Sequence, residues 1–509
     1  MRFRNFHQIL IAVVMAWIFC SQLNSAWTAD ISEYYQVESV NMPAGLDPQV
    51  GGLDFTPDGR LVACFHRGEV YTYNPKSGEW RLFAEGLQEP LGVCAVSNNE
   101  MVIMQRSELT RIQDLDLDGL ADNYETLWDG FGMTGNYHEF AFGPVRDPDG
   151  NFIVSLNLAS NGASIRPEVR GEFSSVGLPE NEFYDRPWKE VKNAAGRMYS
   201  RVPWRGWVIS VSPLGEATPI ASGFRSPNGM AYDLAGNLFV TDNQGDWIGT
   251  SKCYHVKPGQ FYGHPASLVW RKGWTRDPLT VPVEELNAMR TPASWLFPQG
   301  EVANSPTQPL CITEAEKFGP FYGQMLVGEM NVPRILRLAE DKVNGVIQGA
   351  VIPFLDQAGL RSGNNRLVFA PDSSLYVGQT ALSWAGSKGI QRISWKGKTP
   401  PEIHTIKAKK DGFSIHFTLP IDLKSLENLK LVIPSWRYIY HKNYGSPKVD
   451  QKELQIIASK LSDDRKSLFI ETADLEKDRV YGFDLTGLNS RSGNPIVNPT
   501  ATYFMVEKP

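Results

Sequence analysis

Short apolar runs alternate with turn residues along the chain from residue 50 to about residue 395. Each run is about four to eight residues long, which is the length of a strand, and is rich in β-branched and aromatic residues. The turns before these runs contain Asp-Gly, Asn-Gly and similar pairs, which accept positive φ and connect antiparallel strands. The pattern occurs six times, as TPDGRLVACFHRGEVYTY, VSNNEMVIMQRSELTRI, DPDGNFIVSLN, LAGNLFVTDN, FGPFYGQMLVGEM and APDSSLYVGQT.

The spacing of these copies, roughly 40 to 80 residues, predicts an all-β fold with one four-stranded blade per copy. A single blade cannot bury both of its faces, so the blades must stack around an axis. We therefore predict a six-bladed β-propeller over residues 33–397, and a stacked pair of sandwiches is the alternative. Long insertions at 160–205 and 265–300, rich in Trp, Arg and Pro, are expected to cover one mouth of the propeller.

The composition changes around SWKGKTPPEIHTI, where Lys and Pro residues indicate a linker. Beyond it, alternating segments such as GFSIHFTLPID and RVYGFDLTGL are typical of strands. Residues 400–509 are therefore predicted to form a small immunoglobulin- or fibronectin-like β-sandwich. Aromatic residues in this part could form a sugar-stacking face or could be core and rim residues, namely Trp436, Tyr438, Tyr440 and Tyr444.

The N-terminal residues 1–29 differ from the rest of the chain. Arg2 and Arg4 precede an apolar run over 9–20, and small and polar residues follow it. This pattern predicts a secretory signal peptide and a secreted or periplasmic protein. The run is too short to span a bilayer comfortably, so we expect no stable membrane insertion, although an uncleaved anchor is the alternative.

Charge and cysteine content exclude some functions. The net charge is −6, from 50 Lys and Arg against 56 Asp and Glu, and no basic block indicates nucleic-acid binding. No C-x-x-C-H motif is present, so the chain attaches no c-type haem. Beyond the predicted signal peptide, four cysteines allow three disulfide pairings, or they are unpaired core residues: Cys64, Cys94, Cys253 and Cys311.

The segment DLDLDGLADNYE, residues 114–125, matches the calcium-loop pattern D-x-D-x-D-G-x5-E in full. The oxygen ligands of such a loop would be Asp114, Asp116, Asp118, the Leu120 carbonyl, Asp122 and Glu125. Because the preceding SELTRI is typical of a strand rather than a helix, we expect an EF-hand-like loop that braces a connection within a blade. A solvated acidic turn without metal is the alternative.

Two further clusters are candidates for catalysis or ligand binding. The segment GNYHEFAFG places His138 before a strand, where a propeller presents side chains at its mouth, and histidine suits general-base work. Glu139 could orient it or cap the strand, and a structural histidine is the alternative. In residues 223–265, Arg225 lies in a turn before one strand and DNQGD follows the next. These loops could hold an anionic cofactor and a cation, or they could be turn and strand-cap residues.

The order of FRSPNG, DNQGD and KPGQFYGHP resembles the glucose/sorbosone dehydrogenase family, six-bladed propellers that use pyrroloquinoline quinone (PQQ). That family carries an Arg-Asn-Pro-x-Gly turn, an acidic Gly-rich loop and a PGxNYGWP segment in the same order. The similarity covers roughly residues 35–395. The whole chain is most similar to secreted planctomycete-type members that join this propeller to a C-terminal sandwich containing YGSP, here residues 444–447.

The resemblance implies a secreted quinoprotein-like oxidoreductase that oxidises an aldose-type carbohydrate with PQQ and a second calcium ion. His138 and Arg225 would be catalytic, with His138 as the base on the sugar C1 hydroxyl. The implied contacts to PQQ and calcium are Arg225, Asn228, the backbone of Gln244 and Gly245, and Arg361 or Arg366. Electrons would leave to an external acceptor such as a separate cytochrome.

Two other functions are compatible with a propeller. A calcium-dependent hydrolase of the gluconolactonase type would need a converging set of one Glu, two Asn and one Asp. Asn228 and Asp242 are available for this set, together with Glu139 or Glu329. A non-catalytic module that binds polysaccharide or protein is the third possibility.

Overall fold

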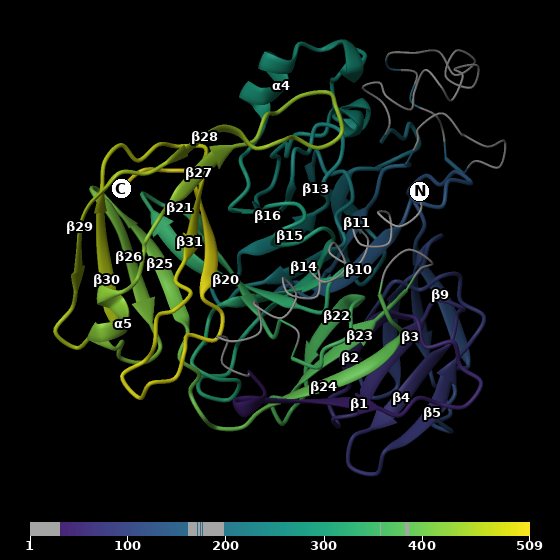
Figure 1. The fold of residues 1–509 in the computed structure, drawn as a ribbon. Coiled ribbons are helices and arrows are strands. Elements are labelled where there is room, and N and C mark those ends of the chain that lie inside the picture. The colour runs from purple at the N-terminus through teal and green to yellow at the C-terminus, as the bar shows by residue number, and fades with distance from the viewer. Residues whose placement is uncertain are drawn as a thin grey trace, which may run out of the picture.

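The computed structural model describes residues 31–160, 170–171, 174, 176, 198–356, 358–381 and 386–509. The predicted signal peptide and most of the insertion at 160–205 lie outside these residues. The regular secondary structure of the described residues is almost entirely β, and the sheets are antiparallel. Figure 1 shows the sheets of residues 31–395 arranged side by side, with the C-terminal strands in yellow at one edge.

Six sheets of four consecutive or nearly consecutive strands make up residues 35–395. The first contains β2 (Val50–Phe55), β3 (Leu61–Phe65), β4 (Val70–Asn74) and β5 (Glu79–Ala84); the second contains β6 (Gly92–Ala95), β7 (Glu100–Met104), β8 (Leu109–Gln113) and β9 (Asn123–Trp128). The third contains β10 (Ala141–Arg146), β11 (Phe152–Leu156), β12 (Trp207–Val211) and β13 (Ala217–Ser222); the fourth contains β14 (Gly229–Tyr232), β15 (Leu238–Asp242), β16 (Ser251–Val256) and β17 (Trp295–Phe297). The fifth contains β18 (Pro306–Cys311), β19 (Met325–Glu329), β20 (Ile335–Val343) and β21 (Val346–Phe354); the sixth contains β22 (Asn364–Phe369), β23 (Leu375–Gln379), β24 (Gly389–Trp395) and β1 (Tyr35–Val40).

The six sheets close into a ring, which confirms the predicted propeller. The first strand of each sheet contacts the first strand of the next, in the order β2, β6, β10, β14, β18, β22 and back to β2. The ring is closed out of sequence order, because β1 from the start of the chain pairs with β24 and completes the last blade. Apolar side chains from neighbouring blades pack between them, as Val62 and Cys64 do with Met101 and Ile103.

Each of the six repeated sequence segments supplies the second strand of a blade and the turn that precedes it. The residue at or just after the end of this strand is polar and buried in every blade: His66, Gln105, Asn157, Asp242, Glu329 and Gln379. First and second strands are antiparallel, so the end of the second strand lies beside the start of the first, as Thr241 pairs with Gly229. The loops before the first strands and after the second strands therefore share one mouth of the propeller.

The strands after residue 400 form two layers. One sheet contains β25 (Ile403–Lys409), β26 (Gly412–Phe417), β30 (Ser467–Thr472) and β29 (Ile456–Leu461). The other strands, β32 (Thr500–Met505), β31 (Arg479–Asp484), β27 (Pro434–Arg437) and β28 (Val449–Glu453), extend the fifth blade into an eight-stranded sheet. A common core between the layers joins Ile352 of the fifth blade to Phe413 and Tyr503. The predicted boundary at 397–400 falls between β24 and β25.

In the part of the chain that the structure describes, helical segments are few and short. They are η1 (Ile31–Glu33), η2 (Pro265–Trp270), η3 (Pro278–Thr280), α4 (Val283–Met289) and α5 (Leu423–Glu427), of which η2, η3 and α4 belong to the predicted insertion at 265–300. Among the described residues, no helix is both long and apolar enough to cross a membrane.

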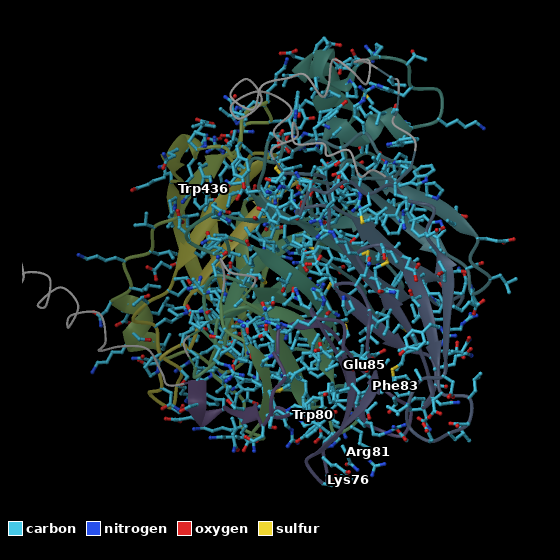
Figure 2. All side chains as sticks on the ribbon, turned by 90° about the vertical axis from the view of Figure 1, so that its right-hand side faces the viewer. Lys76, Trp80, Arg81, Phe83, Glu85 and Trp436 are labelled. Atoms are coloured by element: carbon cyan, nitrogen blue, oxygen red, sulfur yellow. The ribbon has the colours of Figure 1, made fainter. Side chains whose placement is uncertain are left out.

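Side chains fill the interior between the sheets (Figure 2). In that view, Trp436 lies in the C-terminal strands, well away from Trp80 and Phe83 on the outermost strand of the first blade. Trp436 is only 4% exposed and is a core residue, not part of a sugar-stacking face. Cys64, Cys94, Cys253 and Cys311 are buried and unpaired, so none of the three possible disulfide pairings is present.

Candidate functional site

The turn FRSPNG, which precedes β14, is held by a carboxylate from the end of β15. Asp242 accepts hydrogen bonds from the backbone N–H of Arg225 at 3.0 Å and of Ser226 at 2.6 Å. Asp242 is fully buried, and this burial raises its pKa while the two N–H donors and the Arg225 charge oppose the rise. Asp242 thus fixes the backbone from which the Arg225 side chain starts, with one N–H bonded to each of its two carboxylate oxygens.

His138 and Arg225 are joined through Leu158, the second residue after β11. The Leu158 N–H donates to the Arg225 carbonyl at 3.1 Å, and the Leu158 carbonyl lies 3.0 Å from His138 Nδ1. A carbonyl can only accept, so Nδ1 carries the proton and Nε2 keeps its lone pair. Burial, and then the Arg225 charge, lower the pKa of His138 to about 3. His138 is therefore a neutral imidazole whose Nε2 can accept a proton.

Arg225 extends along the backbone of the DNQGD loop. A Cβ on Gly245 would lie 2.8 Å from Arg225 Cγ, so only glycine allows this close approach. The Arg225 Nε is buried without a hydrogen-bond partner among the described residues, and so are Oδ1 of Asn243, Asp246 and Asn157. The Arg225 Nε and the amide oxygens of Asn243 and Asn157 are thus available to a ligand, whereas Asp246 Oδ1 faces His264 Nε2 at 3.5 Å. This donor set fits a cofactor with carboxylates and a hard cation.

Arg366 and Asn228 meet near the hub of the propeller. Arg366 donates to Asn228 Oδ1 at 2.7 Å, to the carbonyls of Gly51 and Leu91 at 2.8 Å, and to the Asn365 carbonyl at 2.8 Å. These partners belong to the first, second, fourth and sixth blades. Two residues predicted to contact PQQ therefore use their polar groups to join blades to one another.

The other predicted cofactor residues are placed apart from this contact. Arg361 precedes β22 and donates to Gln379 Oε1 at 2.9 Å, at the end of β23; no contact of Arg361 with His138 or Arg225 is present among the described residues. The Gln244 N–H donates to Ser251 Oγ at 3.0 Å. The Gly245 carbonyl accepts a hydrogen bond of 2.9 Å from Gly445 N–H, so any cation there would share this carbonyl with the C-terminal part of the chain.

The two glutamates considered for a hydrolase are structural. Glu139 is fully buried and accepts from the Thr134 N–H and hydroxyl and from the Ser200 hydroxyl, at 2.6 to 2.7 Å. Glu329, at the end of β19, accepts four backbone N–H bonds of 2.6 to 2.9 Å from the loops beside it. Like Asp242, each of these glutamates holds the loops beside it through hydrogen bonds. The set of one Glu, two Asn and one Asp considered for a gluconolactonase-type site stays a prediction.

The acidic segment 114–125 consists of the loop between β8 and β9, residues 114–122, and the first three residues of β9. Ligand oxygens of Asp114, Asp116 and Asp122 lie within 4.8 Å of one another. Asp118 instead accepts from the Leu120 N–H, and Glu125 forms an ion pair of 2.7 Å with Arg111, its cross-strand neighbour. The structure thus gathers three of the predicted ligands and directs Glu125 elsewhere.

Sequence reasoning missed the contribution of the C-terminal strands to this mouth. Tyr444 and Asp246 form an isolated β-bridge, and the Arg225 guanidinium carbon lies 5.9 Å from the centre of the Tyr444 ring. The YGSP segment was visible in the sequence, but no spacing could show that it lands on DNQGD. The same applies to His264, whose Nε2 lies 3.5 Å from Asp246 Oδ1 in a fully buried pair.

Comparisons with known proteins give the following matches. A domain of unknown function, DUF7133, matches residues 76–176. Among solved structures, the chain is similar to an oxidoreductase (glucose dehydrogenase) from Thermus thermophilus, with 19% identity, a TM-score of 0.47, and 71% of this chain and 99% of that chain covered. It is also similar to the PQQ-bound aldose sugar dehydrogenase of Streptomyces coelicolor, with 16% identity, a TM-score of 0.43, and 71% and 98% coverage.

A third solved structure is the PQQ domain of pyranose dehydrogenase from Coprinopsis cinerea, with 14% identity, a TM-score of 0.46, and 72% and 96% coverage. No curated protein matches the chain.

Proposed function

We propose that this chain is a secreted quinoprotein-like oxidoreductase that oxidises a carbohydrate of the aldose type. The observation that carries the proposal is the His138–Leu158–Arg225 arrangement, which combines a neutral imidazole and a buried guanidinium at one mouth of a propeller. PQQ with calcium would supply the two-electron acceptor for the hydride from sugar C1. The export part of the proposal is supported by the signal-peptide pattern in residues 1–29.

His138 would act as the base. The sugar C1 hydroxyl would give its proton to Nε2 while the C1 hydrogen leaves as hydride, so the aldose becomes a lactone and loses two electrons. The Leu158 carbonyl keeps Nδ1 protonated and therefore keeps the Nε2 lone pair in place. Burial and the Arg225 charge lower the pKa of His138 to about 3, so the imidazole would be unprotonated at the working pH but a weak base. Its uptake of the proton would therefore have to be coupled to the departure of the hydride to the quinone. The electrons would finally pass to an external acceptor such as a separate cytochrome.

Arg225 would bind an anionic group of the cofactor. Its Nε is buried without a partner among the described residues, which would be costly unless a ligand or water fills the place. The backbone of Gln244 and Gly245, with the nearby oxygens of Asn243 and Asp246, would hold the cation. Asn228, Arg366 and Arg361 remain proposed contacts, although the hydrogen bonds of Arg366 to four blades make a structural role more important for it.

The test adds PQQ and Ca²⁺ to the purified cofactor-free protein and follows quinone absorbance and dye reduction with a panel of aldoses. We expect binding and turnover, and we expect His138→Gln to lower kcat at least a hundredfold without loss of quinone binding. The matched control is His255→Gln, which removes a half-buried histidine on β16. Lactone hydrolysis without quinone would support the hydrolase instead. Sugar binding without turnover, unchanged in His138→Ala, would support a non-catalytic module.

We also propose that the loop between β8 and β9 binds a structural calcium ion. Asp114 is 4% exposed, and its Oδ1 has no hydrogen-bond partner among the described residues, while its Oδ2 accepts the Gly119 N–H. The loop also donates from the Ala121 N–H to the Phe83 carbonyl of β5, so an ion there would brace the second blade against the first.

The calcium proposal is tested by calorimetric titration of Ca²⁺ and by the unfolding temperature with and without Ca²⁺. Asp114→Asn should abolish high-affinity binding and the calcium-dependent gain in stability. Glu125→Gln should leave both unchanged, because Glu125 pairs with Arg111 instead. Equal losses in the two variants would mean that the full sequence motif, not the observed cluster, is the site.

A further inference from the structure

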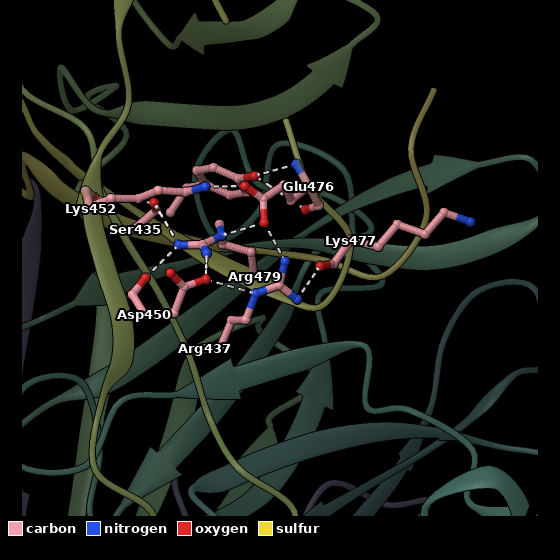
Figure 3. A network of polar contacts seen from close by, with 8 residues as sticks. Ser435, Arg437, Asp450, Lys452, Glu476, Lys477 and Arg479 are labelled. Atoms are coloured by element: carbon pink, nitrogen blue, oxygen red, sulfur yellow. Dashed lines mark hydrogen bonds and ion pairs between the residues drawn. The ribbon is translucent and has the colours of Figure 1, made fainter. Parts of the chain in front are cut away.

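The strands β27 and β28 are joined by residues 438–448, here called the C-terminal hairpin loop. Its base is held by a network of charged side chains (Figure 3). Arg479, which is fully buried, bonds Ser435 at 3.1 Å and the Asp450 carbonyl at 2.9 Å, and it pairs with the Asp450 carboxylate. Arg437 and Lys452 both pair with Glu476. The hydrogen bond from Lys452, together with Arg437, lowers the pKa of Glu476 to about 2, so this network stays charged across the working pH range.

The tip of the C-terminal hairpin loop is bonded to the DNQGD loop of the fourth blade. The Gly445 N–H donates to the Gly245 carbonyl at 2.9 Å, the Ser446 N–H to the Gly249 carbonyl at 2.8 Å, and the Trp247 N–H to the His441 carbonyl at 3.1 Å. These are main-chain bonds, as between strands, and they fix position more firmly than side-chain contacts do. In Figure 1 this loop runs from β27 and β28 across the top of the propeller towards α4.

Aromatic packing reinforces this contact. Tyr440 donates its hydroxyl to the Gly263 carbonyl, and its ring lies 5.4 Å from the ring of buried Trp247. Gly445 has a φ of +67°, and a Cβ there would lie 2.8 Å from the Gln244 side chain, so glycine is required at the point of closest approach. The loop is thus held at both its base and its tip.

The clamped loop places one tyrosine ring beside Arg225. Tyr444 is 43% exposed, and its ring centre lies 5.9 Å from the Arg225 guanidinium carbon. A second tyrosine, Tyr137, is 61% exposed, and its ring lies 5.8 Å from the His138 ring. Each of the two side chains proposed to act on cofactor and substrate therefore has an exposed aromatic ring next to it. Other tyrosines are exposed as well, such as Tyr322, so the placement of these two rings beside His138 and Arg225 carries the inference, not their exposure.

We propose that Tyr444 and Tyr137 form the carbohydrate-binding walls of the site, so that the C-terminal strands contribute directly to substrate specificity. The inference rests on the proposed function. An aromatic face packs against the C–H face of a pyranose ring, while the hydroxyls of the sugar remain free for polar partners. Tyr137 would contact the ring oxidised at C1 beside His138. Tyr444, supplied by the C-terminal hairpin loop, would contact a second ring, so the preferred substrate is a disaccharide or longer oligosaccharide with a free reducing end.

The experiment compares Tyr444→Ala, Tyr444→Phe and Tyr137→Ala with the wild type. Tyr322→Ala is the matched control, because Tyr322 is 51% exposed in the turn between β18 and β19, at the opposite end of the blades. Binding of glucose and cellobiose to the cofactor-free protein is measured by saturation-transfer NMR and calorimetry. KM and kcat for both sugars are then measured with PQQ and Ca²⁺.

We expect Tyr444→Ala to weaken cellobiose binding about three- to tenfold and to raise KM equally, with kcat nearly unchanged. Glucose binding should change little in Tyr444→Ala but should weaken in Tyr137→Ala. Tyr444→Phe should behave as wild type, because it keeps the ring, and so should Tyr322→Ala.

Other outcomes separate this inference from the proposed function. Turnover with PQQ but equal cellobiose KM in the wild type and Tyr444→Ala would overturn the inference and leave the function standing. If Tyr444→Ala loses PQQ affinity but binds sugar as the wild type does, Tyr444 only positions Arg225. That result would also overturn the inference. Cellobiose binding that depends on Tyr444 without any turnover would uphold the binding wall and refute the oxidoreductase. Failure of the wild type to bind either sugar would refute the binding walls.

Discussion

The contact of Arg366 with four blades can be tested by the substitution Arg366→Met. Methionine keeps most of the length of the side chain and removes every N–H donor. The carbonyls of Gly51 and Leu91 and Oδ1 of Asn228 would then lose a partner in a site where Arg366 itself is only 5% exposed. The cavity at the hub has a volume of about 30 Å³, room for only about two water molecules, so water cannot replace all the lost donors. We therefore expect the substitution to destabilise the whole propeller.

The size of the effect follows from two opposing contributions. Each hydrogen bond to a charged donor is worth about 1.5–3 kcal/mol, and the low end applies because one guanidinium nitrogen serves three acceptors. Burial lowers the pKa of Arg366 from 12.5 to about 10, so burying the charge already costs about 3 kcal/mol, which the substitution recovers. The five side-chain hydrogen bonds of Arg366, at about 1.5 kcal/mol each, outweigh this recovered cost, so the net loss of stability should be about 4 kcal/mol. With about 2.1 cal/mol/K of unfolding entropy per residue, this lowers the unfolding midpoint of the propeller by about 5 °C.

The assay is thermal and urea denaturation of the cofactor-free protein, followed by tryptophan fluorescence. Arg361→Met is the matched control, because Arg361 is half-buried and, among the described residues, its side chain donates hydrogen bonds only to the Gln379 side chain and the Ile390 carbonyl. It should cost about 1 kcal/mol. A midpoint for Arg366→Met within 1 °C of the wild type, roughly the error of the method, combined with lost PQQ binding, would refute the structural role and assign Arg366 to the cofactor.

Three further substitutions test the site and its surroundings. Gly245→Ala puts a Cβ 2.8 Å from Arg225 Cγ and must displace the Arg225 side chain. PQQ affinity, measured by absorbance titration, should therefore fall at least about tenfold. Unchanged affinity would show that Arg225 does not hold the quinone. Asp242→Asn replaces an acceptor oxygen by an amide that faces an N–H donor, so urea denaturation should show a loss of about 2–3 kcal/mol; a loss below 0.5 kcal/mol would mean that the turn is fixed by other contacts. Burial lowers the pKa of His66 to about 4, whereas a histidine in the unfolded chain titrates near 6.5. The free energy of unfolding should therefore decline as the pH falls from about 6.5 to 4, by up to about 1.4 kcal/mol per pH unit for this group. His66→Gln should remove that part of the slope in urea titrations at pH 5 and pH 7, and an unchanged slope would mean that His66 is charged in the folded protein.

The local parts of the fold could be predicted from the sequence, because the turn and the strand that follows it are contiguous. TPDG and the five related turns connect the first and second strands of the blades, and the second strands end where the apolar runs end. The pairing of β1 with β24 could not be predicted this way, since Tyr35 and Trp395 are partners separated by most of the propeller. Strand pairing of this kind depends on how the blades close, and no local pattern records it.

The candidate site shows the same limit. His138, Arg225 and Asp242 were singled out because each lies at a strand end, and the structure does bring them together through Leu158. Glu125 also satisfied a sequence motif, yet its place on β9 puts it directly opposite Arg111, and the ion pair across the strands decides its direction. A motif specifies which residue types are present, whereas the register of the strands decides which of them converge.

The C-terminal strands are part of the propeller in a physical sense and not an appended module. In the eight-stranded sheet, β32 pairs with the outer edge of the fifth blade, where Ala350 lies opposite Tyr503. Without β32, the edge of β21 would expose a row of unpaired N–H and C=O groups, and Ala339, Ala350 and Ile352 would lose the apolar layer that covers them. The same strands carry the C-terminal hairpin loop to the mouth that contains Arg225. One sheet therefore connects the edge of the fifth blade to the C-terminal hairpin loop, whose Gly445 N–H is bonded to the Gly245 carbonyl beside Arg225.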